Sequence, residues 1–318
     1  MKKYLIVGGA GFIGSHLVKI LLKEENDACV VVYDNFSSGR KWHLEEVTGN
    51  RNLKIVKADV KDIKTLKSTM KGIDIVYHLA SNPDISRAIT KPDIDFWEGT
   101  YLTHNVLEAM RINNVKKILY ASGSGVYGDA GSEEVNEDYP FKLPISTYGA
   151  SKLASEALIS AYCYMFDMQG VCFRLANVVG PGQTHGVGYD FVRKLLKNPK
   201  ELVILGDGRQ SKSYIYITDV IQAMRLLEKK TPSGFSYYNV SSLDYLEVRE
   251  IADMVVEIMG LKKVRYRYTG GDRGWKGDVP VVRMNSEKIR RLSWSNKYNS
   301  RTAMRMSIKH ILQEVGRR

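Results

Sequence analysis

The sequence predicts an α/β protein in which a doubly wound parallel sheet has helices on both faces and is followed by a second, smaller α/β lobe. Three observations support this fold class. Short apolar runs alternate with helical patterns in the first half of the chain, a glycine-rich turn joins the first run to the first helical pattern, and the alternation loosens after about residue 176. Such alternation is typical of parallel sheets, whose strands need long crossovers, usually helical, to return the chain to the same edge.

The expected strands are short apolar runs of the kind that parallel sheets bury on both faces. They lie at 3–7, 28–33, 53–56, 73–79, 116–121 and 171–175, with helices at 12–24, 62–70, 96–112 and 147–165. Later in the chain, 214–217 and 237–240 resemble strands and enclose a helix at 219–227. We therefore predict one domain at 1–176, joined by 214–241, and a substrate-binding lobe at 177–318, mainly 177–213 and 242–318.

The first turn has the pattern of a Rossmann-type dinucleotide-binding site. Gly8, Gly11 and Gly14 stand between the apolar run at 3–7 and the helical pattern that follows it. Glycines at these spacings allow a tight turn, close approach of a pyrophosphate, and close packing of the helix on the strand. The N-terminus of the helix offers its free N–H groups and positive dipole end to the phosphates. A tight βα turn that binds nothing is the alternative interpretation.

Asp34, at the end of the second expected strand, predicts which dinucleotide binds. It lies about 20 residues beyond the glycines, where a ribose-binding carboxylate is expected. A carboxylate accepts hydrogen bonds from a free 2′-hydroxyl and repels a 2′-phosphate, so we predict NAD. Arg40 and Lys41 keep NADP open as the alternative, because both are cations close to this position. Asp59, after the third strand, is placed to meet the adenine or to cap a helix.

Tyr148 and Lys152 are the candidate catalytic pair. Residues four apart in a helix lie on the same face, with about 5–6 Å between their Cβ atoms. A free tyrosine has a pKa near ~10, and bringing it to about 7 requires stabilising the phenolate by roughly 4 kcal/mol. A lysine ammonium in a partly dry cleft supplies part of that free energy. An exposed helix pair without chemistry is the alternative interpretation.

Composition favours a cytoplasmic protein. The chain has 318 residues and a formal net charge of +12, but basic and acidic residues are interleaved except in the last third. Steering of an anionic substrate or solubility explains this charge, so we expect no nucleic-acid partner. No apolar run approaches ~18 residues and the first strand begins too early for a signal peptide, so we expect no membrane partner. The three cysteines lack the spacing of metal ligands, and we expect no metal.

Further motifs extend these patterns almost from end to end of the chain. They are Gly8–Gly14, Asp34–Gly39, Asp59–Val60, His78–Ala80, Val126–Gly128, Tyr148–Lys152, Arg174–Asn177, Gly206–Gln210 and Tyr214–Asp219. With these motifs the chain resembles the extended short-chain dehydrogenase/reductase family and, within it, the NAD-dependent nucleotide-sugar epimerases. It is most similar to UDP-glucose (UDP-galactose) 4-epimerases of the archaeal type. The motifs are specific for the family and much less specific for the sugar.

The resemblance implies a set of catalytic and binding residues. Tyr148 would be the base, with Lys152 as its partner and as a ligand of the nicotinamide ribose. The residues implied for NAD are Gly8, Gly11, Phe12, Ile13, Gly14, Asp34, Asn35, Ser37, Ser38, Gly39, Asp59, Val60, Leu79, Ala80, Tyr148 and Lys152. The residues implied for the nucleotide sugar are Asn177, Val187, Lys212, Tyr214 and Arg273.

The resemblance also implies a homodimer. The helices near 96–112 and 147–165 would pair with a second subunit as a four-helix bundle. An apolar stripe at Leu153, Ala157 and Ala161 suits burial in that bundle, and it equally suits packing inside one chain.

Three positions depart from the family pattern. Gly123 stands where the family has a Ser or Thr whose hydroxyl bridges the substrate and the tyrosine. We expect Ser124 to replace that hydroxyl, with Ser122 as the alternative. Gly99 stands in place of an Asn that often contacts NAD. Lys212 stands in place of an Arg that holds the substrate phosphate, which keeps the charge but loses the bidentate fork.

The resemblance implies NAD-dependent 4-epimerisation of a UDP-hexose, UDP-glucose or UDP-galactose, in galactose metabolism. Tyr148 would take the proton of the 4-hydroxyl while the C4 hydride moves to NAD, and the hydride would return to the other face of a transient 4-keto sugar. Dehydratases of the family have acids where this chain has Ser124 and Gly125. Two alternatives stay open, namely an NAD-dependent dehydrogenase of a small substrate such as threonine, and a non-catalytic NAD-sensing protein.

Overall fold

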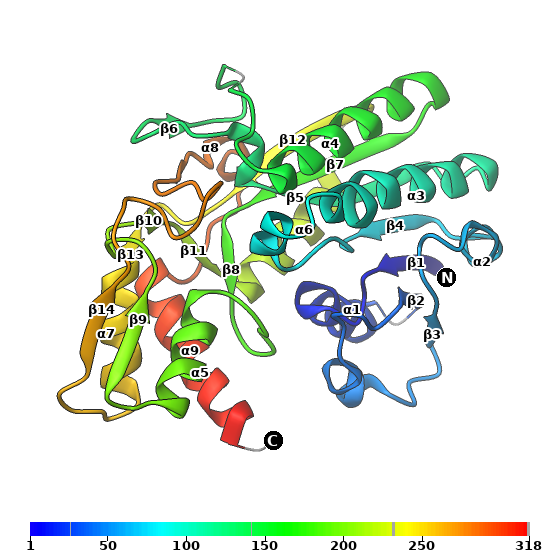
Figure 1. Ribbon diagram of the computed structural model, residues 1–318. Helices are drawn as coiled ribbons and strands as arrows, with labels where there is room; N and C mark the ends of the chain where they lie inside the picture. The colour runs from blue at the N-terminus through cyan, green and yellow to red at the C-terminus, as the bar shows by residue number, and fades with distance from the viewer. Residues whose placement is uncertain (26, 141, 231–232, 317–318) are drawn as a thin grey trace. The chain divides into compact units, whose positions relative to one another are not determined.

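The computed structural model describes residues 1–25, 27–140, 142–230 and 233–316 and contains a seven-stranded sheet (Figure 1). Its strand order is β12-β7-β5-β4-β1-β2-β3. These strands are β1 (Lys2–Val7), β2 (Ala28–Asp34), β3 (Leu53–Lys57), β4 (Ile75–His78), β5 (Lys117–Gly123), β7 (Gln169–Leu175) and β12 (Phe235–Val240). Strands β1 to β5 pair in parallel, and the chain returns from β3 to place β4 beside β1. The predicted doubly wound parallel sheet is therefore confirmed.

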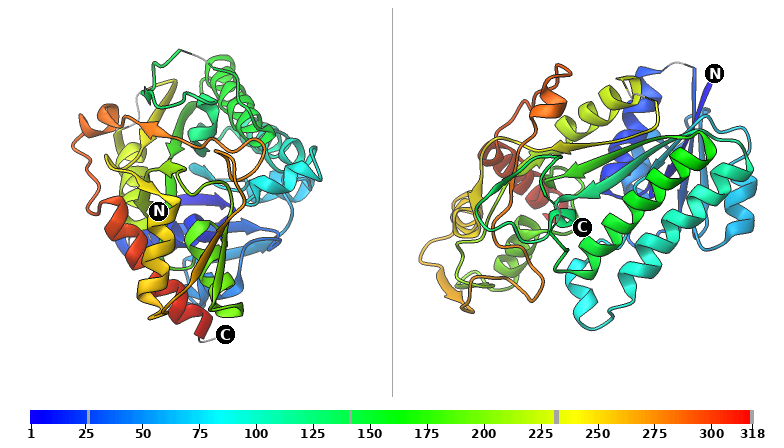
Figure 2. Two further views of the ribbon diagram at one scale, coloured as in Figure 1. Left: turned by 60° about the vertical axis from the view of Figure 1, so that its left-hand side comes forward. Right: turned by 90° about the horizontal axis from the view of Figure 1, so that it is seen from above.

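Helices cover both faces of this sheet. They are α1 (Phe12–Glu24), α2 (Ile63–Thr69), α3 (Tyr101–Ile112), α4 (Thr147–Phe166) and α6 (Ile217–Lys230). Leu5 belongs to a buried cluster with residues of α2, α3 and α4, whereas the adjacent Tyr4 hydrogen-bonds Glu228 of α6 on the other face. Helices α3 and α4 lie side by side (Figure 2). The helix predicted at 96–112 is present, but it begins with a π-helical turn at Phe96–Thr100.

Packing divides the chain into two compact units. The first comprises Met1–Gly123, Thr147–Arg174 and Ile221–Tyr238, and the second comprises Ser124–Ser146, Leu175–Val220 and Asn239–Arg318. The sequence predicts an NAD-binding domain at 1–176, joined by 214–241, and a substrate-binding lobe at 177–318. Because these boundaries are defined by which ligand each part binds, they stay a prediction. Within the part of the chain that the structure describes, no helix combines the length and the hydropathy needed to cross a membrane.

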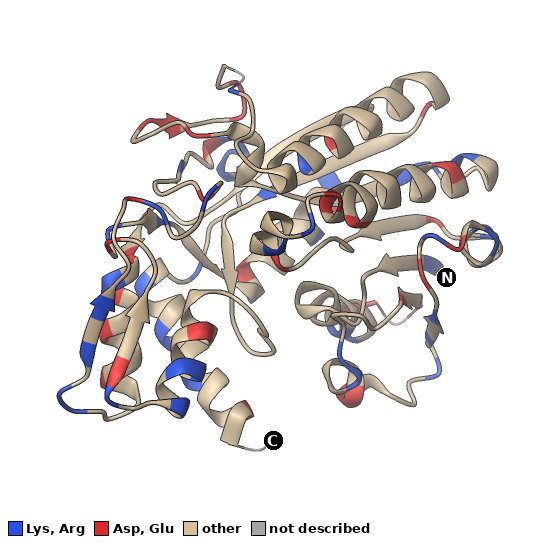
Figure 3. Cartoon of the chain, in the orientation of Figure 1, with Lys and Arg blue, Asp and Glu red and all other residues tan. Residues whose placement is uncertain are grey.

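The second unit is built from short elements. Its paired strands are β10 (Ser211–Lys212) with β13 (Leu246–Glu247), β11 (Tyr214–Tyr216) with β8 (Asn177–Val179), β14 (Arg265–Tyr268) with β9 (Glu201–Ile204), and β15 (Arg283–Met284) with β6 (Glu134–Val135). Its helices are α5 (Val187–Lys197), α7 (Val248–Ile258), α8 (Glu287–Arg290) and α9 (Ser300–Gly316). A short 3-10 turn at Ser124–Tyr127 belongs to this unit, whereas those at Lys41–Val47 and Ile85–Ile89 belong to the first unit. Basic and acidic segments are interleaved in Figure 3, and Arg265 and Arg267 of β14 both pair with Glu201 of β9.

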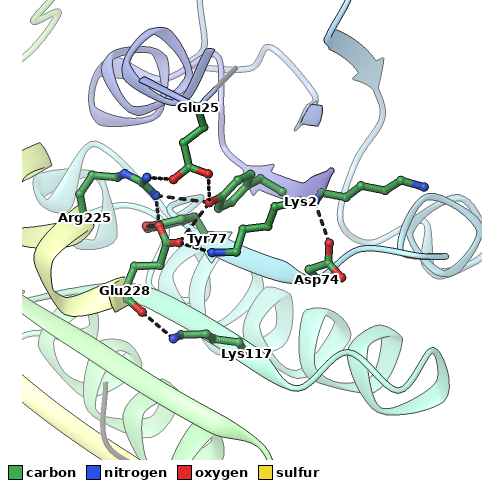
Figure 4. A network of polar contacts seen from close by, with 9 residues as sticks. Lys2, Glu25, Asp74, Tyr77, Lys117, Arg225 and Glu228 are labelled. Carbon is green, nitrogen blue, oxygen red and sulfur yellow. Dashed lines mark hydrogen bonds and ion pairs between the residues drawn. The ribbon is translucent and has the colours of Figure 1, made fainter. Parts of the chain in front are cut away.

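A buried network of charges fixes α6 to the sheet in the first unit (Figure 4). Glu228, whose side chain is 1% exposed, accepts hydrogen bonds from the hydroxyls of Tyr4 (3.1 Å) and Tyr77 (2.7 Å). Arg225 pairs with Glu228 and also with Glu25, the residue that follows α1. The network therefore joins α1, α6, β1 and β4 through groups shielded from water, where electrostatic interactions are strong.

Candidate active site

The glycine turn after β1 has the shape expected for phosphate binding. Gly8 has a φ of 83°, and a Cβ there would lie 2.7 Å from the backbone N of Ala80. A Cβ on Gly14 would overlap with the backbone O of Gly8. Side chains are therefore excluded at both positions, which keeps the backbone of the turn accessible to a phosphate. Helix α1 begins at Phe12 with Gly11, which has no side chain, as its N-cap.

The parallel register brings the predicted NAD-binding residues to one edge of the sheet. Gly8, Asp34 and Leu79 stand at the carboxyl ends of three adjacent strands, the edge at which open parallel sheets bind ligands. Nδ2 of Asn35 donates a hydrogen bond to Oδ2 of Asp59 at 2.8 Å, so these two predicted residues are in contact. The other predicted residues lie beside them, with Phe12 and Ile13 in the first turn of α1, Ser37, Ser38 and Gly39 after β2, Val60 after β3, and Ala80 after β4.

Asp34 closes the glycine turn through both of its carboxylate oxygens. One oxygen accepts a hydrogen bond from the backbone N–H of Ala10 (2.9 Å) and the other from that of Phe36 (2.8 Å). Burial raises the pKa of this carboxyl, whereas the two backbone hydrogen bonds and the nearby His43 lower it. A carboxylate oxygen can accept a second hydrogen bond, so Asp34 still suits a ribose hydroxyl.

Tyr148 and Lys152 lie in the first two turns of α4, one turn apart. Nζ of Lys152 is 5.4 Å from the ring centroid of Tyr148 and 4.9 Å from that of Tyr120, and it donates to the backbone O of Ala121 at 2.7 Å. Burial lowers the pKa of Lys152 to about 8. Tyr148 is partly exposed, but the protein around its hydroxyl excludes water and raises the pKa to about 12. These side chains alone therefore keep the phenol protonated at neutral pH, and a positive charge beside it would favour the phenolate.

Two residues outside the predicted site lie next to this pair. The side chain of Ser81 is next to the hydroxyl of Tyr148 and lowers its pKa, as a hydrogen-bond donor to the phenolate does. Asp95, which is 1% exposed, accepts hydrogen bonds from Nδ2 of Asn82 (2.8 Å) and from Oγ1 of Thr147 (2.7 Å). A separation of 52 residues between Asp95 and Thr147 gives no local pattern from which this contact could be predicted.

Packing of helices explains the glycine at position 99. A Cβ on Gly99 would overlap with Oγ of Ser151 in α4, so a larger side chain fits there only if that hydroxyl moves. Hydroxyl contacts continue this close packing along the two segments, from Thr100 to Ser151 (3.2 Å) and from Thr103 to Ser155 (3.0 Å). The Asn expected from the family would therefore displace the Ser151 hydroxyl and disturb its contact with Thr100.

The two candidate hydroxyls lie in different units. Ser124 begins the turn Ser124–Tyr127 in the second unit and is half-buried. Ser122 is the penultimate residue of β5 and is 4% exposed, and its Oγ has no hydrogen-bond partner among the described residues. Residues two apart in a strand share a face, so Ser122 lies on the same face as Tyr120, whose ring is next to Lys152. The Ser122 hydroxyl is therefore on the face that α4 covers.

In the second unit, two predicted phosphate ligands meet at one loop. Nζ of Lys212 is 2.6 Å from Oδ1 of Asp278. Arg273 donates to the backbone O of Asp278 (2.8 Å) and to the carboxylate of Asp129 (2.7 Å). The hydrogen bond from Arg273 lowers the pKa of Asp129. Each cation is thus paired with a carboxylate, and neither carboxylate is among the predicted site residues.

The other predicted substrate ligands lie on or near the strand pair β8–β11. Asn177 and Tyr214 are opposite each other in its register. Nδ2 of Asn177 donates to the backbone O of Ser213 at 3.2 Å, between Lys212 and Tyr214 in the chain. Burial raises the pKa of Tyr214. Val187 lies on a separate element, at the start of α5.

Known proteins share both sequence and fold with this chain. The model of the NAD dependent epimerase/dehydratase family matches residues 4–241. The chain is 33% identical to the UDP-glucose 4-epimerase of Mycolicibacterium smegmatis, over 80% of this chain and 82% of the relative. It is 28% identical to the human dTDP-D-glucose 4,6-dehydratase, over 93% of this chain and 86% of the relative. A crystal structure of a UDP-galactose 4-epimerase matches with a TM-score of 0.87 at 36% identity, covering 98% of this chain and 99% of that chain.

Proposed function

Because this chain belongs to the NAD dependent epimerase/dehydratase family, we propose that it is a nucleotide-sugar 4-epimerase that interconverts UDP-glucose and UDP-galactose. Enzymes of this family use NAD, and the family resemblance seen in the sequence is confirmed. The observation that supports the proposal most is the Tyr148–Lys152 pair beside a sheet edge suited to NAD. Ser124 and Gly125, in place of acids, make dehydration the less favoured reaction.

The residues of the first unit fit NAD. Side chains are excluded at Gly8 and Gly14, where a phosphate would approach, and Asp34 offers carboxylate lone pairs to a ribose. NAD held by these residues would supply an acceptor for the C4 hydride of the sugar and a donor for its return to the opposite face. Tyr148 would accept the proton of the 4-hydroxyl and give it back, so no proton is gained or lost overall. Lys152 would stabilise the phenolate through its positive charge.

Product analysis tests this proposal. The protein is incubated with UDP-glucose, UDP-galactose, their N-acetyl forms and UDP-glucuronate without added cofactor, and the products are separated. We expect conversion between UDP-glucose and UDP-galactose, and release of NAD when the protein is denatured. A 4-keto-6-deoxy product would identify a dehydratase, accumulation of NADH with a small substrate would identify a dehydrogenase, and NAD release without any turnover would indicate a sensor.

Arg273 and Lys212 are proposed to hold the diphosphate, which would then compete with Asp129 and Asp278 for these cations. A charge-assisted hydrogen bond contributes about 1.5–3 kcal/mol, so we expect Arg273→Ala to raise KM for the UDP-sugar by roughly 10- to 100-fold. The kcat should change little, because a contact far from C4 stabilises the ground state and the transition state alike. Arg265→Ala, in an exposed pair with Glu201, is the matched control and should leave KM unchanged. A fall in kcat at unchanged KM would contradict this role.

A second prediction concerns the hydroxyl next to the substrate oxygen. The sequence favours Ser124, whereas the structure favours Ser122. The Ser122 hydroxyl is buried without a partner among the described residues, which costs about 1–3 kcal/mol unless a ligand accepts or donates a hydrogen bond there. We therefore expect Ser122→Ala to lower kcat by about 10-fold or more, and Ser124→Ala to have the smaller effect. Steady-state kinetics of the two variants measure both values of kcat. A larger loss of kcat in Ser124→Ala than in Ser122→Ala would identify Ser124 as the bridging residue.

We propose that α3 and α4 pair with a second subunit. Ala157 and Ala161 are exposed, so packing inside one chain does not explain the apolar stripe on α4. Tyr164 continues that face and is 91% exposed, and Trp97, which precedes α3, is also exposed. Sedimentation should give twice the 36.0 kDa mass of the chain, and a monomer would refute the pairing.

We also propose that the protein acts in the cytoplasm, in galactose metabolism, without a nucleic-acid or membrane partner.

A further inference from the structure

Tyr148 has a hydroxyl neighbour in the loop after β4, away from the strand on which the family pattern places one. His78 of β4 pairs with Tyr120 of β5, and Ser81 and Gly123 each follow three residues after that pair. The hydroxyl expected at Gly123 is missing, whereas the side chain of Ser81 is close enough to the phenol of Tyr148 to lower its pKa. The structure thus supplies a hydroxyl from the loop after β4, in addition to the serines at the end of β5.

A buried carboxylate joins the two segments that contain Ser81 and Tyr148. Asn82, directly after Ser81, donates to Oδ1 of Asp95, and Thr147, directly before Tyr148, donates to Oδ2 of the same carboxylate. Asn82 is itself held in place, because it is 4% exposed and its amide also donates to a backbone oxygen of the chain after it. One side chain therefore fixes the distance between the two hydroxyl groups.

Burial of the Asp95 carboxylate costs free energy, for which other interactions must compensate. A carboxylate removed from water is unfavourable and is retained only where hydrogen bonds satisfy it. Its negative charge also raises the pKa of Tyr148, which opposes formation of the phenolate. The two carboxylate oxygens of Asp95 connect the loop after β4 with the first turn of α4. Asp95 therefore fixes the relative positions of these two segments.

We propose that Ser81 is a positioning residue for Tyr148, donating a hydrogen bond to the phenolate oxygen, and that Asp95 holds the two in register through Asn82 and Thr147. This inference rests on the proposed function, in which Tyr148 is the base. Charge balance is preserved, because the proton moves only between the sugar oxygen and Tyr148, and Ser81 keeps its own proton.

The ionisable groups of the first unit that face Tyr148 come from several elements. Lys152 lies one turn along α4, Asp95 directly before the π-helical turn, and Tyr120 on β5. His78 of β4 stays neutral because burial lowers its pKa to about 3. The hydrogen bond with Ser81 lowers the pKa of Tyr148, and the charge of Asp95 raises it, so removing the two groups shifts this pKa in opposite directions.

Three variants test the proposal through the pH profile of kcat. The acidic limb of this profile is the pH range in which kcat rises as Tyr148 loses its proton. Ser81→Ala should move this limb to higher pH and lower kcat at neutral pH by roughly 10- to 100-fold, because a hydrogen bond to a charged group is lost. Ser81→Thr keeps the hydroxyl and should restore both the limb and the rate. Asp95→Asn removes a negative charge and should move the limb to lower pH. The same shifts should appear without substrate in tyrosinate absorbance, measured as the difference from Tyr148→Phe.

Ser86→Ala is the matched control, since Ser86 is an exposed serine of the same loop whose hydroxyl bonds Asp84, and it should shift nothing. The inference is overturned if Ser81→Ala and Asp95→Asn shift the limb in the same direction or not at all, or if Ser81→Thr fails to rescue. Should Asp95→Asn not fold, the two Ser81 variants decide alone. Absorbance shifts as expected in a protein that epimerises no UDP-sugar would overturn the proposed function and leave this inference standing.

Discussion

Tyr148→Phe should lower kcat for epimerisation by roughly 10²- to 10⁴-fold while the purified protein keeps its NAD, because general base catalysis contributes an effect of this size. The substitution removes only the hydroxyl. The ring remains, and with it the packing that places Nζ of Lys152 5.4 Å from the ring centroid. Steady-state kinetics and the NAD released on denaturation measure the two quantities independently.

Tyr162→Phe is the control for this prediction. Tyr162 is in the same helix, and its hydroxyl bonds Glu108 at 2.7 Å, away from the candidate pair. The same chemical change there should leave kcat and NAD content unchanged. Retained activity in Tyr148→Phe would remove Tyr148 as the base, and loss of NAD from that variant would show that the hydroxyl serves binding rather than proton transfer.

The NAD-binding part of the candidate site could be predicted because backbone geometry relates its residues. Asp34 follows the glycine turn by about 20 residues, the length of one helix and one strand. Lys152 follows Tyr148 by one helical turn. In both cases a fixed spacing in the sequence becomes a fixed distance in space. The strands of the sheet were expected at 3–7, 28–33, 53–56, 73–79, 116–121, 171–175 and 237–240, because these apolar runs stand out in the sequence.

The contacts that the sequence did not reveal depend on tertiary packing. Arg273 and Lys212 were identified as cations, but their partners Asp129 and Asp278 lie 144 and 66 residues away from them, respectively. Ion pairs at such separations leave no periodic pattern. The paired strands of the second unit are two to four residues long, too short for the alternation of a half-buried strand to be recognised. Gly99 was visible as a departure, but its close contact with Ser151 of α4 required the fold.

Among stability effects, the largest is expected for Glu228→Gln, which should lower the free energy of unfolding by roughly 3–5 kcal/mol, the typical cost of removing one partner from a buried ion pair. The substitution keeps the size of the side chain and removes its charge. Arg225, which is buried, then keeps Glu25 as its carboxylate partner but loses Glu228, and the hydroxyl of Tyr77 loses a charged acceptor (Figure 4). The urea concentration at the midpoint of unfolding, with its slope, measures the change.

Two comparisons separate this burial effect from a general loss of charge. Glu46→Gln breaks the exposed pair with Lys19, in which the Glu46 side chain is 77% exposed, and should cost at most about 1 kcal/mol. Adding Arg225→Met to Glu228→Gln should recover part of the loss, because the unpaired buried cation is then gone and the two changes are not additive. If Glu228→Gln lowered the free energy of unfolding as little as Glu46→Gln, the prediction would be contradicted. Water would then have to reach the network, and apolar packing alone would hold α6 on the sheet.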